Sequence, residues 1–116
     1  MNRWTEIDRR EVDGYTIKIC KTYEDMSVRD DILEGTEEYF DELEAKIDNG
    51  EMEWFQLRVQ ATIRDYVLGE TYCGGFLYDD AMEILTDDVI DDMAYDAIKD
   101  ANAEKVYLKE ALELLV

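Results

Sequence analysis

Apolar and polar residues alternate along two stretches of the chain with a period of two, which is typical of half-buried β-strands. The first stretch is YTIKIC, residues 15–20. The Asp13-Gly14 pair directly before it is a strong signal for a two-residue hairpin turn. We therefore expect a first hairpin, in which Trp4 to Val12 forms the partner strand.

The second alternating stretch covers residues 55–64, FQLRVQATIR, and is the longest in the chain. Residues 68–71, LGET, can turn the chain, so that Tyr72 to Tyr78 returns as an antiparallel partner. Gly74-Gly75 within this returning strand predicts a β-bulge or a close approach of another backbone.

A helical pattern with clear start and stop signals lies between the two hairpins. Thr36 is a suitable N-cap, and Asn49-Gly50 is a typical C-terminal stop. Phe40, Leu43 and Ile47 form the apolar seam, with Tyr39 at its margin. The preceding residues 24–35 are expected to form a loop with a short helical turn.

The C-terminal block predicts two more helices. We expect the first to begin after Thr86 and to bury an apolar stripe formed by Ile90, Met93, Ala94, Ala97, Ile98 and Ala101. We expect the second to cover roughly Glu104 to Leu115, with Val106, Leu108, Ala111, Leu112 and Leu115 on its apolar side. The resulting order, ββ-α-ββ-αα, predicts a single α+β domain over residues 1–116. Its antiparallel sheet has about four strands in two hairpins and packs against about three helices.

The charge of the chain is far from balanced. There are 31 acidic and 12 basic residues, giving a formal net charge of −19. By segment, the net charge is −1 for residues 1–30, −9 for 31–57, zero for 58–78 and −9 for 79–116. The excess therefore sits in two blocks, and both blocks coincide with predicted helices.

This charge favours some partners and opposes others. Nucleic acids and anionic membranes would be repelled, whereas a basic protein surface would be attracted. No apolar run approaches the roughly 20 residues that span a bilayer. The first 14 residues hold no continuous apolar segment, so no secretory signal is expected, and a cytoplasmic location in a bacterial host cell is the default expectation. Solubility alone, or a halophilic source, are alternative reasons for the charge.

Acidic residues stand above acidic residues on the predicted helices. Asp88, Asp92, Asp96 and Asp100 recur every four residues, and like charges at that spacing oppose helix formation by roughly 0.2–0.5 kcal/mol per pair. Retained repulsion of this kind predicts a partner that supplies positive charge. The residues expected to contact such a partner are Asp87, Asp88, Asp91, Asp92, Asp96, Asp100, Glu37, Glu38, Asp41, Glu42, Glu44 and Asp48.

Candidate chemistry is sparse. The chain has no histidine, which removes Ser-His-Asp and Cys-His catalysis and histidine-based zinc sites. The GETYCGG stretch lacks the lysine and the spacing of a phosphate-binding loop. Cys73 is a weak candidate for a reactive thiol; Cys20 and Cys73 are expected to be reduced and packed. We expect no enzymatic activity and no cofactor.

Acidic clusters also raise the question of a metal site. Asp79-Asp80 and the aspartates between 87 and 92 could bind Ca²⁺ or Mg²⁺ weakly, but neither stretch has the central glycine of an EF-hand loop. Nonspecific attraction of cations is therefore the preferred interpretation, and no metal ligand is assigned.

Small size, high negative charge, an α+β pattern and acid-striped helices together resemble the DNA-mimic and anti-defence proteins of phages and mobile elements, which include anti-CRISPR and anti-restriction proteins. In addition, LGETYCGGFLYDDAMEILTDDVIDDMAYDAI resembles a segment of small phage proteins, over about residues 52–101. The resemblance implies an inhibitor that blocks a basic nucleic-acid-binding surface of a host defence complex by steric and electrostatic competition.

A different function class remains open from the sequence. An acidic interaction module, resembling a secretion chaperone or an antitoxin, would bind a basic protein through apolar grooves more than through charge. The apolar residues from Val106 to Val116 also suggest a homodimer interface as a possibility.

Overall fold

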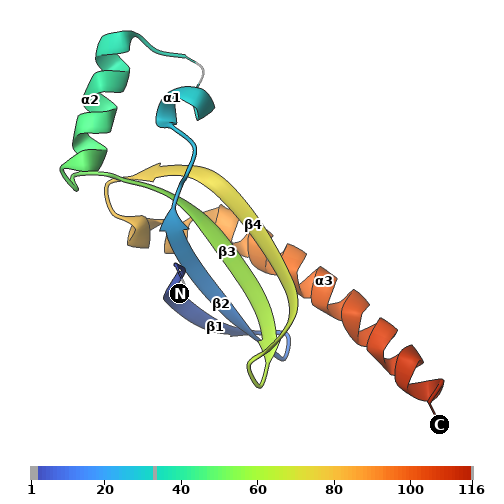
Figure 1. Ribbon diagram of the computed structural model, residues 1–116. Coiled ribbons are helices and arrows are strands. Elements are labelled where there is room, and N and C mark those ends of the chain that lie inside the picture. The colour runs from blue at the N-terminus through green and yellow to red at the C-terminus, as the bar shows by residue number, and fades with distance from the viewer. Residues whose placement is uncertain (1–2, 33, 116) are drawn as a thin grey trace.

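A computed structural model describes residues 3–32 and 34–115, and it confirms the α+β class. Four antiparallel strands form one sheet in the order β1-β2-β3-β4, with each strand paired to its neighbour in sequence (Figure 1). The strands are β1 Thr5–Val12, β2 Tyr15–Tyr23, β3 Glu53–Ile63 and β4 Tyr66–Tyr78. The helical elements are α1 Val28–Asp31, α2 Glu37–Asp48, the 3-10 helix η1 Ala81–Thr86 and α3 Asp88–Glu113.

The first hairpin turns where the sequence predicted. Asp13 and Gly14 have φ values of 52° and 85°, as a two-residue turn with both residues in the left-handed region requires. The second turn was predicted wrongly at 68–71. The chain instead reverses at Arg64 and Asp65, with φ values of 49° and 69°, so that Ile63 pairs with Tyr66. Neither residue is glycine, and this turn therefore had no recognisable sequence signal.

β4 begins six residues earlier than predicted and contains two irregularities. Gly74 and Gly75 lie opposite the single residue Gln56, because Phe55 pairs with Phe76 and Leu57 pairs with Cys73. This confirms the predicted bulge. The second shift leaves Leu68 as the extra residue near the start of the strand.

One face of the sheet carries the main core. Its largest fully buried side chains include Tyr15, Ile17, Ile19 and Leu57, which alternate with polar residues on the opposite face. The covering element is α3, which packs against β3 and β4 (Figure 1). Its predicted apolar stripe is confirmed, since Ile90, Met93, Ala97, Ile98 and Ala101 are buried and Ala94 is partly buried.

The C-terminal block forms one long helix, and the prediction of two helices was wrong. α3 continues without interruption through residues 101–104, where the sequence pattern had suggested a break. Its N-cap is Asp87, whereas Thr86 belongs to η1 and donates a hydrogen bond to the Glu83 carbonyl (3.1 Å). Nothing in 101–104 is glycine or proline, so the helical ladder has no reason to stop there.

A second, smaller core holds α1 and α2 at one end of the sheet. It consists of the buried residues Val28, Phe40, Leu43 and Trp54, with Ile47 partly buried beside them. The Trp54 indole donates a hydrogen bond to the Met26 carbonyl (2.7 Å), which ties the connecting loop to β3. The predicted helix over 37–48 and its Thr36 N-cap are confirmed.

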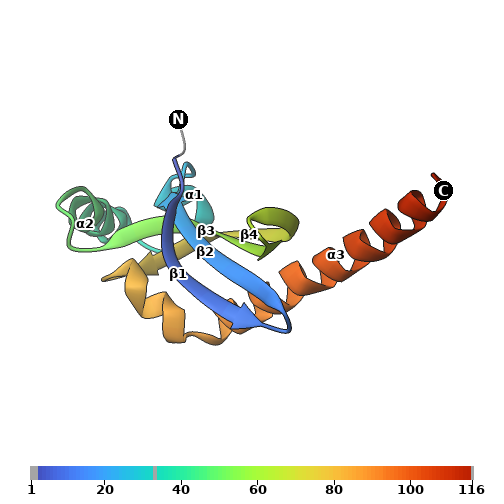
Figure 2. The same cartoon turned by 90° about the horizontal axis from the view of Figure 1, so that it is seen from below.

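The second half of α3 extends beyond the sheet. The side chains predicted for its apolar side are exposed or only partly buried. The molecule measures 65 × 30 × 23 Å, and Figure 2 shows α3 running away from the strands. Among the described residues, no helix is both long and apolar enough to cross a membrane.

Candidate acidic binding surface

Three aspartates form a line along the outer side of α3. Asp88, Asp92 and Asp96 are exposed, and we call them the α3 ladder. Within residues 3–32 and 34–115, their carboxylates make no hydrogen bond or ion pair. Successive ladder residues lie about 6 Å apart along the axis and turn about 40° around it, because the helix has 3.6 residues per turn. The ladder therefore offers three uncompensated charges in a shallow spiral.

Two of the predicted contact residues on α3 have structural roles instead. Asp87 caps the helix by accepting a hydrogen bond from the Val89 amide (3.2 Å), and it accepts a second one from the Tyr78 hydroxyl (2.6 Å). The Tyr78 hydrogen bond is the main reason that the pKa of Asp87 is lowered. The Asp100 carboxylate turns toward β4 and accepts from the Glu70 amide (3.3 Å). Their charges are exposed, but their orientation is set by the fold.

Asp91 occupies the flank of α3 that faces the first hairpin. It lines a groove of about 430 Å³ together with Arg10, Asp13, Tyr95 and Lys99, among others. It is exposed and has no hydrogen-bond partner in the described part of the chain. Asp91 can therefore contact a partner, although from a different direction than the ladder.

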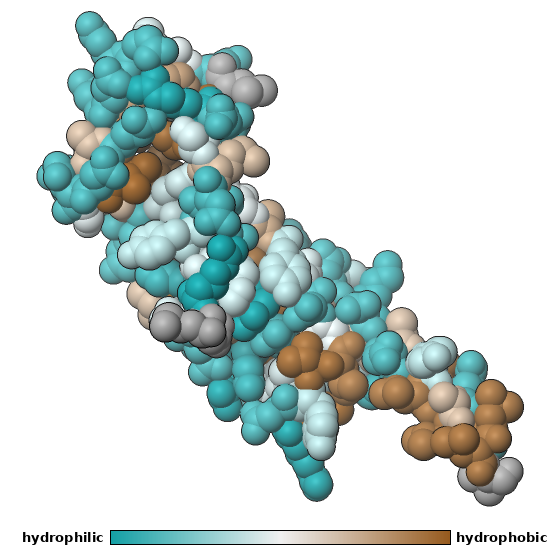
Figure 3. All heavy atoms as spheres, in the orientation of Figure 1, coloured by the Kyte–Doolittle hydropathy of each residue, from teal (hydrophilic) through white to brown (hydrophobic). Residues whose placement is uncertain are grey.

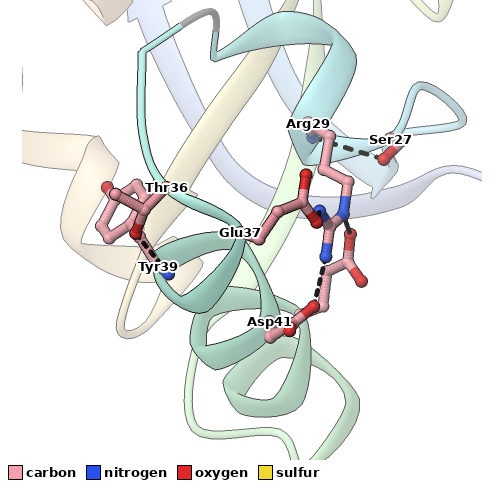
Figure 4. A network of polar contacts seen from close by, with 7 residues as sticks. Ser27, Arg29, Thr36, Glu37, Tyr39 and Asp41 are labelled. Atoms are coloured by element: carbon pink, nitrogen blue, oxygen red, sulfur yellow. Dashed lines mark hydrogen bonds and ion pairs between the residues drawn. The ribbon is translucent and has the colours of Figure 1, made fainter.

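The acids of α2 are partly neutralised by a single arginine. Arg29, on α1, donates to Glu44 (2.6 Å), to Glu37 (2.6 Å) and to Asp41. Figure 4 shows its guanidinium between Glu37 and Asp41. The same group lies over the Phe40 ring, 5.5 Å from the centroid. These three carboxylates raise the pKa of Arg29, with the Glu44 hydrogen bond as the largest cause.

The Arg29 cluster changes the interpretation of α2. Three of its six predicted contact residues hold α1 and α2 together, which leaves Glu38, Glu42 and Asp48 exposed and unpaired within the described residues. Sequence reasoning missed Arg29 because it lies in the stretch expected to be a loop. The signal was present, since Glu37, Asp41 and Glu44 recur at positions i, i+4 and i+7 on one helix face and Arg29 is the only base between Lys21 and Lys46.

The two acidic helices are connected to the same end of the sheet. Glu53, at the start of β3, pairs with Tyr78, at the end of β4. Because α2 precedes β3 and η1 follows β4, both acidic segments leave the sheet at this end (Figure 1). The uncovered face of the sheet is different, since two of its bases pair with acids: Arg9 with Glu6 (3.0 Å) and Lys18 with Asp65 (3.1 Å). The excess charge is therefore concentrated on the helices.

Other candidate chemistry gains no support from the geometry. Within the described part of the chain, no three His, Cys, Asp or Glu side chains are placed to hold a metal ion. Cys20 is buried as expected, but Cys73 is exposed, so the expectation of a packed thiol there was wrong. The bulge at Gly74-Gly75 disturbs the pairing beside Cys73, which explains why the simple strand pattern placed it incorrectly.

Comparison of the chain with known protein families, with characterised proteins and with solved structures found no match.

Proposed function

We propose that this protein is an acidic inhibitor that binds a basic nucleic-acid-binding surface of a host defence complex in a bacterial cell, in the manner of a DNA mimic. The observation that carries the proposal is the α3 ladder, whose three carboxylates are exposed and unpaired in the described residues. Binding is competitive and involves no enzymatic turnover, cofactor or metal ion.

The spacing of the ladder supports a nucleic-acid-like pattern of charge. Its carboxylates recur at about 6 Å along the axis of α3. Every second phosphate of one DNA strand recurs at about 6.8 Å along the axis of the duplex. A groove that binds duplex DNA carries Lys and Arg at positions set by the phosphates, so it can meet several ladder carboxylates at once. Asp91, Asp100, Glu38, Glu42 and Asp48 extend the negative field around this centre.

The electrostatic cost of the ladder to helix stability supports the proposal that these aspartates are retained for binding. Asp88/Asp92 and Asp92/Asp96 are like-charge pairs on an exposed helix face, and each opposes helix formation by roughly 0.2–0.5 kcal/mol. The Arg29 cluster shows that this chain does pair acids with a base where structure requires it. Within residues 3–32 and 34–115 no base pairs with the ladder, and a basic partner would relieve its repulsion.

The decisive experiment captures the partner and then tests competition. The tagged protein is incubated with a bacterial lysate at about 50 mM NaCl, and bound proteins are identified by mass spectrometry. We expect a nucleic-acid-binding protein that is released by duplex DNA and by raising NaCl to about 500 mM. Binding that resists both treatments would instead support the chaperone-like or antitoxin-like alternative, which relies on apolar contacts. Recovery of ribosomal proteins alone, or of nothing, would contradict the specific inhibitor.

Charge-reversed variants locate the contact surface. In the first, Asp88, Asp92 and Asp96 are each replaced by lysine. In the matched control, the exposed acids Asp30, Glu34 and Glu51, which lie outside α2 and α3, are replaced by lysine. Three reversals of two units each take the net charge from −19 to −13 in both proteins. We expect the ladder variant to lose binding by more than about 100-fold and the control by less than about fivefold. Equal losses would show that total charge matters and the ladder does not.

A further inference from the structure

We infer that the projecting end of α3 is a self-association surface, through which two copies of the chain pair antiparallel about a twofold axis. The inference does not depend on the proposed function. It rests on the exposed apolar stripe of the helix, on a groove beside it, and on the distribution of charge along α3.

The side of α3 that packs on the sheet continues beyond the sheet with leucines, after Lys105, whose ammonium lies over the Tyr15 ring. Ala101 is the last buried residue of the stripe. Leu108 and Leu112 follow at spacings of 7 and 4 residues, which keeps them within about 20° of Ala101 around the helix axis, and Leu115 lies just beyond the end of the helix at Glu113. Leu108 is 42%, Leu112 63% and Leu115 82% exposed. A core-facing stripe therefore continues into solvent.

The exposed apolar area is large for a monomer. Val106, Tyr107 and Leu114 are also exposed but lie on other sides of the helix, and Figure 3 shows apolar side chains gathered along this end of the molecule. Leu108, Leu112 and Leu115, with the exposed Ile63, Tyr66 and Val67 of the nearby β3–β4 hairpin, offer on the order of several hundred Å² of apolar surface. This area approaches the roughly 800 Å² per partner of a stable interface. Burial against a second surface would remove most of this area from water.

The same chain provides a complementary groove at the base of the projecting helix. This groove has a volume of about 470 Å³ and is lined by Ile63, Tyr66, Val67, Leu68, Glu104 and Leu108. It lies between the tip of the β3–β4 hairpin and α3. The protein thus carries both an apolar helix end and an apolar recess, separated by about one to two helical turns.

Antiparallel pairing brings the helix end and the groove together twice. A twofold axis near residue 110 places Leu112 of one copy opposite Leu108 of the other, and Leu115 beside the groove of the other copy. Each copy then supplies the same patch, as an isologous interface requires. Parallel pairing would instead leave both grooves empty and would bring the two acidic halves of α3 side by side.

The distribution of charge along α3 favours a second copy at this surface and keeps the acidic parts of the two copies far apart. Residues 79–100 carry nine acids and one base, whereas residues 101–115 carry three acids and two bases. The interface is therefore close to neutral in a chain of net charge −19. Because the helix projects along the 65 Å axis, antiparallel pairing holds the two acidic bodies at opposite ends of the dimer. The α3 ladders remain exposed in this arrangement.

Sedimentation equilibrium tests the inference on the full chain. Over about 1 to 200 μM protein, the apparent mass should rise from the chain mass of 13.6 kDa toward twice that value. Raising NaCl from about 50 to 500 mM should strengthen the dimer, since salt screens the repulsion between the two acidic bodies. The proposed partner binding responds to salt in the opposite direction, so failure of one proposal is distinguishable from failure of the other.

Two single substitutions identify the face. Leu112→Glu changes the stripe, and Val106→Glu changes a position about 120° from Leu112 around the same helix; the two side chains are 63% and 58% exposed. We expect Leu112→Glu to weaken the dimer at least about tenfold and Val106→Glu less than about threefold. Both positions are solvent-exposed in a single chain, so helix content by circular dichroism should stay unchanged. A wild-type chain that remains monomeric throughout, or equal effects of the two substitutions, would overturn the inference.

Discussion

Gly69 is the position where α3 crosses β4 at the closest approach. A Cβ atom at this residue would overlap the carbonyl oxygen of Ala97 and the backbone of Ala101. Both neighbours are alanines and both are buried, so the two elements meet nearly backbone to backbone. The sequence pattern had placed Gly69 in a turn, but its role is to let a helix pack tightly onto a strand.

Replacing Gly69 by alanine should therefore destabilise the fold. The added methyl group meets backbone atoms that cannot rotate away, and overpacking of this kind costs about 1–3 kcal/mol. Gly74→Ala is the matched control, because its Cβ would meet the flexible Glu24 carboxylate; we expect a loss below about 1 kcal/mol there. Urea denaturation measures both free energies of unfolding. Equal losses would contradict the assigned helix–strand contact.

Aspartates of similar exposure have different roles within α3. Asp87 caps the helix and Asp100 accepts a hydrogen bond from β4, whereas Asp92 and Asp96 make no such contact in the described residues. The difference follows from where each residue falls relative to the sheet. Only unpaired acids retain their full capacity for a basic partner, which is why the ladder is the centre of the proposed surface.

At the scale of elements, α2 is held by charge as well as by apolar packing. The smaller core buries only a few side chains, and Arg29 adds three ion pairs between α1 and α2. Glu37 and Asp41 are largely exposed, so each of these pairs alone contributes little. Their convergence on one guanidinium above Phe40 gives the cluster its geometry.

Removing this arginine should loosen α2 while leaving the sheet intact. With Arg29→Gln, three carboxylates lose their shared cation and repel one another, so α2 opens more often. We expect amide hydrogen exchange to accelerate in α2, with little change in β2 and β3. Arg3→Gln serves as the control, since Arg3 forms a single exposed pair with Asp25 (3.0 Å). Unchanged exchange in α2 would show that the smaller core suffices.

α3 combines two surfaces of different chemistry in one rigid element. Its first half is acidic on the outer side and buried on the other, and its second half is apolar and nearly neutral. A continuous helix fixes the orientation of one relative to the other. The proposed inhibitor surface and the proposed dimer surface can therefore be occupied at the same time.

At the scale of the whole molecule, charge opposes folding. Thirty-one acids against twelve bases bring many negative groups together in the folded state, where they are closer on average than in the unfolded chain. Four bases of the strands pair with acids, namely Arg9, Arg10, Lys18 and Lys21, so the repulsion comes chiefly from the helices. Stability should consequently depend on ionic strength.

Added salt should raise the thermal midpoint. Between about 10 and 300 mM NaCl the Debye length falls from about 30 Å to below 8 Å, which screens repulsion among exposed acids. We expect a clear increase for the wild type and a smaller one for the variant with lysine at Asp88, Asp92 and Asp96. Differential scanning calorimetry at low protein concentration measures both. A midpoint independent of salt would show that self-repulsion is not a significant term.

The sequence by itself determined the local elements. Alternation predicted β2 and β3, Asp13-Gly14 predicted the first turn, and Thr36 predicted the start of α2. The stripe from Ile90 to Ala101 identified the buried side of α3. These features depend on period, capping and turn chemistry, which act between residues close in sequence.

Tertiary structure decided which charges are available and where the apolar surface ends. Arg29 reaches α2 across a loop, and Asp100 reaches β4 at the exposed edge of the helix–sheet contact, so neither pairing follows from helical spacing alone. Leu108 and Leu112 have the periodicity of core residues, yet the sheet ends before it can cover them. An amphipathic pattern shows which face of a helix is stabilised by burial against another apolar surface. Only the lengths of the packed elements determine whether the same chain provides that surface.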